Sequence, residues 1–346
     1  MKKLLRGSLY ALLILTSLLA VLLYVKRPHT PAIKGPDGRR PPNAVTRLMK
    51  LTIGGVDQWI SIRGHDTSNP VLLFLHGGPG MPMMFLAHAF QRPLEEHFVC
   101  VQWDQRGAGK SFRPDLAEDG LSVRRLLDDL YELVGVLTTW FGKQKIILAG
   151  HSFGSTLGML AVREHPELFE VYIGIGQVVD DERALALQDR FIRQEAAELG
   201  VPEAIADLDR DGPAAHEKWL FRFRAELRAS RSYRPFVKAG VLAPEYGLFD
   251  ILKVAKGSSY SSRHMRYDVI DGPLADNVRE VGVPVYFLMG QYDQVTPLAL
   301  VEEYVRDLEA PHKQIILFRR SAHFPFFEEP GSFARALKAV RDAHER

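Results

Sequence analysis

One serine in this 346-residue chain lies in a pattern typical of a catalytic nucleophile. It is Ser152, within the run G-H-S-F-G at 150–154, and the apolar residues 145–149 precede it. The pattern predicts a strand, a tight turn and a helix, the arrangement that a G-x-S-x-G nucleophile motif requires. Glycine on both sides lets the strand and the helix approach while the hydroxyl stays exposed. We expect Ser152 to attack an acyl carbonyl and the amide of Phe153 to stabilise the resulting oxyanion.

An acid and a histidine follow later in the chain, each just beyond a predicted strand. Asp293 follows the apolar residues 283–289, and His323 follows the β-prone residues 314–318. In open α/β sheets, ligands bind beyond the carboxyl ends of the strands, so side chains placed there can meet. Together with Ser152 they would form a proton relay in which His323 takes the serine proton and Asp293 orients the imidazole.

A glycine-rich loop can complete the site. It has the sequence H-G-G-P-G at 76–80 and follows the fully apolar residues 71–75, which predict a buried strand. Such a loop brings bare backbone amides toward a ligand, although glycine and proline are also the ordinary residues of turns. We expect the amide of Gly78 to be the second oxyanion donor, with Gly77 as the alternative.

The elements that must position these loops alternate between strands and helices. Alternating residues at 47–62 predict an opening hairpin, and apolar runs at 98–103 and 171–175 predict buried strands. Residues 122–140 carry apolar side chains at helical spacing. Residues 179–279 show amphipathic helical patterns without strands, which predicts a helical cap inserted between two strands of the sheet.

These elements predict an α/β fold with a mostly parallel central sheet, helices on both faces and an inserted helical cap. The core would comprise residues 44–178 and 280–346, with the cap at 179–279. In the loop after residues 98–103, we expect Asp104 and Arg106 to form a structural ion pair. Position 104 is not the glycine that a Walker phosphate loop needs, so we reject nucleotide binding there.

The N-terminal residues predict a membrane anchor, residues 1–27, followed by a proline-rich linker, residues 28–43. Residues 7–25 carry no charge, and nineteen helical residues at about 1.5 Å each nearly span a hydrocarbon layer of about 30 Å. A cleaved signal peptide is the alternative, but its A-x-A-like cleavage site is missing. The basic N-terminus favours an extracytoplasmic body, whereas Lys26 and Arg27 favour the opposite orientation. The linker reads as an extended tether.

Composition excludes several classes of protein. A net charge of +2, with acidic and basic residues interspersed, argues against nucleic-acid binding. Cys100 is the only cysteine, so neither an internal disulfide nor a thiolate metal cluster can form. It lies in an apolar run, where we expect it to pack in the core. The predicted chemistry needs neither a metal nor an organic cofactor.

Several motifs resemble those of the α/β-hydrolase superfamily, and most closely the proline iminopeptidase family of serine aminopeptidases. They are H-G-G-P-G at 76–80, W-D-Q-R-G at 103–107, G-H-S-F-G-S at 150–155, G-Q-Y-D at 290–293 and His323. The resemblance covers residue 44 to the C-terminus and implies the α/β-hydrolase fold with a Ser-Asp-His triad. Members of the family hold the free amino group of the substrate with cap glutamates, for which Glu217, Glu226 and Glu245 are candidates here.

The resulting hypothesis is a membrane-tethered serine hydrolase that removes N-terminal residues, preferably proline, from short peptides through an acyl-enzyme. An esterase or lipase on the same fold is the first alternative, and a catalytically silent binding protein is the second. Ser152 excludes the epoxide hydrolase and dehalogenase routes, which need an aspartate at that position. Cap carboxylates converging beyond Ser152 would favour a peptide amine, and an apolar tunnel would favour an ester.

Overall fold

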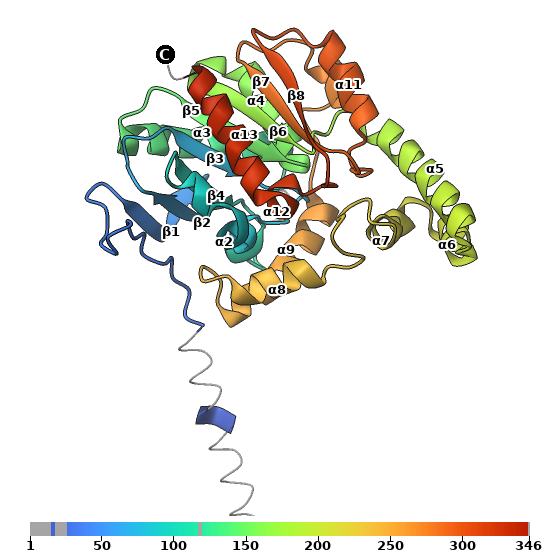
Figure 1. Cartoon of the computed structure of the whole chain (residues 1–346), viewed down its shortest axis with the longest axis horizontal. Coiled ribbons are helices and arrows are strands. Elements are labelled where there is room, and N and C mark those ends of the chain that lie inside the picture. The colour runs from blue at the N-terminus through green and yellow to red at the C-terminus, as the bar shows by residue number, and fades with distance from the viewer. Residues whose placement is uncertain (1–14, 18–25, 117–119, 345–346) are drawn as a thin grey trace, which may run out of the picture.

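The computed structural model describes residues 15–17, 26–116 and 120–344. Within them, eight strands form one sheet in the order β1-β2-β4-β3-β5-β6-β7-β8 (Figure 1). The strands are β1 (Val45–Ile53), β2 (Val56–Gly64), β3 (Val71–Leu75), β4 (Val99–Asp104), β5 (Ile146–His151), β6 (Phe169–Ile175), β7 (Val285–Gly290) and β8 (Lys313–Phe318).

The sheet is antiparallel at one edge and parallel elsewhere. β1 and β2 form a hairpin that pairs with β4, and every pair from β4 through β3, β5, β6 and β7 to β8 is parallel. The predicted strands therefore all form, and the mostly parallel sheet is confirmed. Because neighbouring parallel strands end at one edge, the loops after β3, β5, β7 and β8 leave the sheet on the same side.

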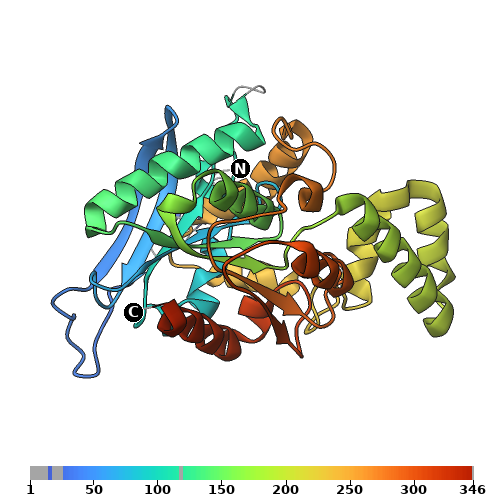
Figure 2. The same ribbon diagram turned by 90° about the horizontal axis from the view of Figure 1, so that it is seen from above.

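Helices cover both faces of this sheet (Figures 1 and 2). They are α2 (Ala87–Phe90), α3 (Val123–Phe141), α4 (Phe153–Glu164), α5 (Asp181–Leu199), α6 (Pro202–Asp211), α7 (His216–Arg222), α8 (Arg234–Leu242), α9 (Leu248–His264), α10 (Leu274–Asn277), α11 (Leu298–Asp307), α12 (Pro325–Glu328) and α13 (Pro330–His344).

The strand β3 shows why two layers of helices are needed. All five of its residues are buried, and alternate side chains enter two different hydrophobic cores. Leu73 packs with residues of α3 and α4 on one face, and Phe74 packs with residues of α2, α12 and α13 on the other. A strand buried on both faces reads as a continuous apolar run, which is the pattern seen in the sequence.

The residues predicted to form a cap, 179–279, lie between β6 and β7 and contain α5 to α10. Helices α5 and α6 project away from the sheet, and α8 and α9 lie along another end of the body (Figures 1 and 2).

In the loop after β4, the ion pair predicted between Asp104 and Arg106 is replaced by another pair. Arg106 instead donates to Asp129 of α3, at 2.8 and 2.9 Å, because that buried carboxylate faces its guanidinium.

The predicted membrane anchor falls almost wholly outside the described residues. Among the helices that the structure describes, none combines the length and apolarity needed to cross a membrane. The linker is not a free tether, because residues 26–33 lie against the body. The amide of His29 donates to Pro244 O at 2.9 Å, Arg63 Nη1 donates to Thr30 Oγ1 at 2.6 Å, and Ile33 is buried. Its backbone polar groups find partners on the folded surface.

Candidate active site

Ser152 lies at the tip of a strained turn between β5 and α4. Its φ is 52° and its ψ is −125°, a conformation that non-glycine residues rarely adopt. A side chain at Gly150 would come within 2.3 Å of Gly154 O, and one at Gly154 within 2.4 Å of Leu75 O. Glycine at both positions therefore lets the strand, the turn and the helix pack this closely.

Asp293 and His323 contact each other at the ends of β7 and β8. His323 Nδ1 lies 2.8 Å from Asp293 Oδ2, and both side chains are almost fully buried. Asp293 also accepts hydrogen bonds from Thr296 Oγ1 at 2.7 Å and from the amides of Val295 and Thr296, at 2.9 Å each. These donors hold the carboxylate in one orientation, and the carboxylate in turn holds the proton of the imidazole on Nδ1. This contact leaves Nε2 as the ring nitrogen of His323 that does not face Asp293.

Ser152 and His323 line the same cavity, whose volume is about 400 Å³. They come from β5 and β8, which are separated in the sheet by β6 and β7. The short loops after these parallel strands bring the serine, the histidine and, through His323, the aspartate to one edge of the sheet. Distant positions in the chain thus become neighbours through strand order.

The glycine-rich loop after β3 closes against Ser152. A Cβ at Gly77 would lie 2.9 Å from the Cβ of Ser152, and Gly78 has a φ of 111°. Gly78 lines both cavities that contain Ser152. Phe153 is the first residue of α4, where backbone amides have no partner within the helix and the helix dipole is positive. All three predicted oxyanion residues, Gly77, Gly78 and Phe153, therefore lie beside the serine.

Two buried histidines support these loops and were not singled out in the sequence. His151 Nε2 donates to His323 O at 2.9 Å, and the two rings lie 4.7 Å apart. Burial lowers the pKa of His151 well below its usual value, and the neighbouring His323 adds to the shift. Burial also lowers the pKa of His76 to about 4, and its neutral Nε2 accepts the amide of Gln105 at 3.1 Å. Both rings are neutral supports near neutral pH.

Two of the three candidate glutamates line the cavity that holds Ser152 and His323. They are Glu217, on α7, and Glu226, in the segment between α7 and α8. Glu217 accepts a hydrogen bond from the hydroxyl of Tyr233. Burial raises the pKa of Glu226 well above its usual value, and the negative charges of Glu217 and Asp293 raise it further. A cation in the cavity would relieve this repulsion.

Backbone hydrogen bonds tie Glu226 to the loops that carry the acid and the histidine. The amide of His323 donates to Glu226 O at 3.1 Å, and the amide of Gln294 donates to Ala225 O at 3.1 Å. Glu328, in α12, accepts from the amides of Ala229 and Ala322 at 2.7 and 2.8 Å. The backbone at Glu226 is therefore held in a fixed relation to the backbone at His323.

Glu245 requires a correction. It is buried beside the N-terminal linker, accepts a hydrogen bond from Thr30 Oγ1 at 3.2 Å and lines a small crevice with Arg63 and Glu95. This residue lies in the turn between α8 and α9, which packs against the linker and not against Ser152. The structure thus separates it from Glu217 and Glu226.

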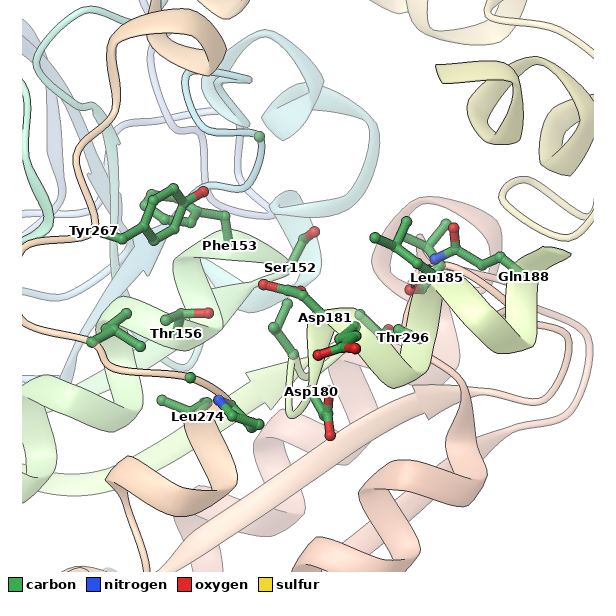
Figure 3. A pocket seen from close by; sticks show the side chains of 18 residues that line it. Ser152, Phe153, Thr156, Asp180, Asp181, Leu185, Gln188, Tyr267, Leu274 and Thr296 are labelled. Atoms are coloured by element: carbon green, nitrogen blue, oxygen red, sulfur yellow. Dashed lines mark hydrogen bonds between the residues drawn. The ribbon is translucent and has the colours of Figure 1, made fainter. Parts of the chain in front are cut away.

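A second cavity, of about 630 Å³, adjoins the first and is also lined by Ser152. Figure 3 shows Ser152 and Phe153 on one side of this cavity and Leu185 and Gln188 of α5 on the other. Asp180 and Asp181, at the start of α5, also line it, and burial raises the pKa of Asp181. Ser152 therefore lines both cavities, which also share Gly78, Leu185 and Gln188.

Sequence reasoning missed Thr296 and Tyr233, which hold Asp293 and Glu217. A signal existed for Thr296, because a threonine three residues after an aspartate can bond back to it in a turn. No local signal marks Tyr233, whose role depends on how α7 and α8 pack. Among the residues that the structure describes, no group of three histidine, cysteine, aspartate or glutamate side chains is arranged to hold a metal ion.

Comparison with known proteins agrees with this geometry. Residues 70–330 match the family model described as the alpha/beta hydrolase fold. The chain is 32% identical over 304 residues to the probable aminopeptidase YbaC of Bacillus subtilis, an alignment that covers 85% of this chain and 96% of that protein. It is 25% identical over 289 residues to a proline iminopeptidase of Heyndrickxia coagulans, covering 78% and 88% of the two chains.

Among solved structures, the proline iminopeptidase of Mycobacterium smegmatis superposes with a TM-score of 0.66 at 18% identity. The match covers 86% of this chain and 98% of that one. At this level of identity the likeness concerns the fold.

Proposed function

The chain belongs to the α/β-hydrolase fold family and is proline iminopeptidase-like, and from that premise we propose that it is a serine aminopeptidase. Its substrates would be short peptides with a free N-terminus, from which it releases the first residue, preferably proline. Ser152 would be the nucleophile, His323 the general base and acid, and Asp293 the residue that orients the imidazole.

The contact of His323 with Asp293, and the cavity that Ser152 and His323 share, support the following reaction. His323 Nε2 takes the proton of Ser152 as the serine oxygen bonds to the carbonyl carbon, and the C–N bond breaks as the same proton passes to the leaving amine. Water then repeats the attack on the acyl-enzyme, and Ser152 leaves with its proton restored. The amides of Phe153 and of Gly78, or of Gly77, would hold both oxyanions. Each such donor is worth about 2.7–4 kcal/mol of transition-state stabilisation in comparable sites.

The two carboxylates in the cavity would determine which substrates the site prefers. Glu217 and Glu226 line the cavity of Ser152 and His323, so an ammonium group there would pair with them while the adjoining carbonyl reaches the serine. The walls include Phe236, Phe324 and Phe326, which suit an apolar side chain or a pyrrolidine ring. The second cavity would hold the leaving peptide.

The test compares three substrates on the full chain. Proline β-naphthylamide should be hydrolysed, whereas the N-acetylated form, which has no positive charge, should be hydrolysed at least 10-fold more slowly, if one charged hydrogen bond of about 1.5–3 kcal/mol is lost. A short-chain nitrophenyl ester serves as the third substrate. Preference for the ester, or equal rates for the two naphthylamides, would assign the site to an esterase instead.

Active-site labelling separates this proposal from a catalytically silent binding protein. A fluorophosphonate probe should label the wild-type chain at Ser152 and should leave Ser152→Ala unlabelled. Absence of labelling in a folded wild-type chain would favour the silent protein.

A further inference from the structure

The outer faces of α8 and α9 are unusually apolar for solvent-exposed helices. Five large apolar side chains on them are between 46% and 63% exposed: Val237, Val241, Leu242, Phe249 and Leu252. Exposed apolar side chains are ordinary when scattered singly, but their grouping on two adjoining helices is the mark of an interaction surface. We call these five residues the α8–α9 face.

The helical spacing separates this face from the side that packs on the body. In α8, Val237 and Val241 are one turn apart and exposed, whereas Phe236, Ala239 and Gly240 are buried. In α9, Phe249 and Leu252 are exposed, whereas Gly257 and Ser261 are buried against the loop that follows β4. Both helices therefore already have a core-facing side, and the α8–α9 face is a second apolar surface.

The helices are held firmly in this orientation. The hydroxyl of Tyr246, between α8 and α9, donates to the buried Asp104. Lys110 Nζ lies 2.6 Å from Asp250 in the first turn of α9, and it also lies 4.4 Å from the ring centroid of Trp59. The α8–α9 face thus projects from a rigid support.

The first residues of the described segment 26–116 contact α8 and the turn that follows it. Lys26 Nζ donates to Val241 O in α8, and the amide of His29 donates to Pro244 O. The chain also packs against Gly247, where an added Cβ would lie 3.1 Å from Pro28 Cγ. Figure 1 shows α8 and α9 at one end of the body. The sequence before Lys26 is the uncharged apolar run 7–25.

Basic residues surround the face. Arg234, Lys238 and Lys256 are exposed on the same two helices, and Arg27 is exposed at the start of the described segment 26–116. Asp250 is the only acidic residue in α8 or α9, and it is paired with Lys110. Apolar side chains flanked by lysine and arginine are typical of surfaces that bind anionic lipid.

We propose that the α8–α9 face rests on a lipid bilayer containing anionic lipid, the same bilayer in which the sequence predicts an N-terminal anchor. The apolar side chains would lie at the acyl boundary and the basic ones among the headgroups. This contact adds to the anchor predicted from the sequence, and it does not depend on which bond the active site hydrolyses.

The contact would also set the position of the active site. Tyr233 and Phe236, at and just after the start of α8, and Ser258 and Ser262, on the inner side of α9, line the cavity that contains Ser152. The two helices would therefore separate the bilayer from the cavity, and a substrate would reach Ser152 close to the membrane surface.

The test places a fluorescent reporter on the face of the full chain in liposomes. Cys100 is buried, so Phe249→Cys provides a single accessible thiol for an environment-sensitive label. Leu199→Cys is the matched control, because Leu199 is 58% exposed at the far end of α5. In vesicles of phosphatidylcholine and phosphatidylglycerol, spin-labelled lipid should quench the label at position 249 several-fold more than the label at position 199.

A second variant tests the role of charge. In the labelled Phe249→Cys chain, Lys238→Glu with Lys256→Glu should reduce quenching in vesicles with phosphatidylglycerol, and pure phosphatidylcholine should reduce it for the unchanged chain. Equal quenching at 249 and 199 overturns the proposal. A fluorescence change at 249 that depends on protein concentration, without quenching by lipid, also overturns it and assigns the face to contacts between copies of the chain.

Discussion

The active site combines two regions that are built differently. Ser152, Asp293 and His323 follow strands of one sheet, whereas Glu217 and Glu226 belong to the helical segment between β6 and β7. The positions of the first group depend on strand order and on short loops. Glu226 lies outside any helix or strand and is positioned by backbone hydrogen bonds to the loops of the first group.

This difference separates reactivity from selectivity. In the proposed reaction, the residues that follow the strands would supply a nucleophile, a base and oxyanion donors, which any acyl substrate needs. The carboxylates of Glu217 and Glu226 would distinguish a substrate with a charged amine from one with a neutral group. Changes in the first region should therefore affect all substrates, and changes in the second should affect only substrates with a free amine.

The largest effect should come from Ser152→Ala. Removal of the nucleophile should lower kcat by about 10⁴- to 10⁶-fold for peptide and ester substrates alike. Ser259→Ala, on the exposed surface of α9, is the matched control and should retain activity. Turnover close to wild type in Ser152→Ala would remove the nucleophile from the proposal.

Asp293→Asn should come next. The amide cannot hold the imidazole in the required tautomer or stabilise its charged form, so kcat should fall by about 10³- to 10⁴-fold for both substrate classes. Steady-state kinetics with proline β-naphthylamide and a nitrophenyl ester measure the effect. The exposed Asp276→Asn should be silent, and a loss confined to the peptide substrate would contradict the role given to Asp293.

The folded chain should also lose stability in acid because of His76, which lies in the loop after β3. Its pKa is lowered to about 4 by burial, so the unfolded chain takes up a proton below about pH 6.5 while the folded chain does not. The free energy of unfolding should therefore fall by about 3 kcal/mol between pH 6.5 and pH 4 from this residue. Denaturation across this range should show that the free energy of unfolding falls less steeply with decreasing pH in His76→Gln than in wild type. His29→Gln, at an exposed histidine, should show the same dependence on pH as wild type.

In the cap, Glu226→Gln should change selectivity. Loss of one charged hydrogen bond should lower kcat/KM for proline β-naphthylamide by about 10- to 100-fold and leave the ester rate unchanged. Glu217→Gln should act in the same direction. Glu245→Gln is the matched control, because this residue lies in a different crevice. A similar loss for the ester would show that Glu226 serves the chemistry as well.

The smallest effect should be on stability. Because the pKa of Glu226 is raised in the folded chain, the folded state keeps a proton that the unfolded state has already lost above about pH 4.5. Wild type should therefore lose stability as the pH rises through the folded pKa, and Glu226→Gln should not. Denaturation experiments should show that the free energy of unfolding of Glu226→Gln, relative to that of wild type, is higher at pH 8 than at pH 5. No change in their difference would contradict this pKa shift.

Particular residues show which features of the structure could be predicted from the sequence. The elbow at Ser152 and the strand before it could be predicted because each depends on residues adjacent in the chain. Ser122 was the expected start of a helix, and it caps α3 by accepting the amide of Arg125 at 3.2 Å. The pairing of Arg106 with Asp129 could not be predicted, because it depends on where α3 crosses the loop after β4.

By itself, the sequence determined the fold, through apolar periodicity, and the candidate residues for acyl transfer, through their places after strands. Only the tertiary structure decided that Glu217 and Glu226 share a cavity with Ser152, that Glu245 does not, and that the linker packs against the turn between α8 and α9. The reason is the range of the interactions. Periodicity reports which side of its own element a residue faces, whereas irregular segments take their positions from contacts with distant parts of the chain.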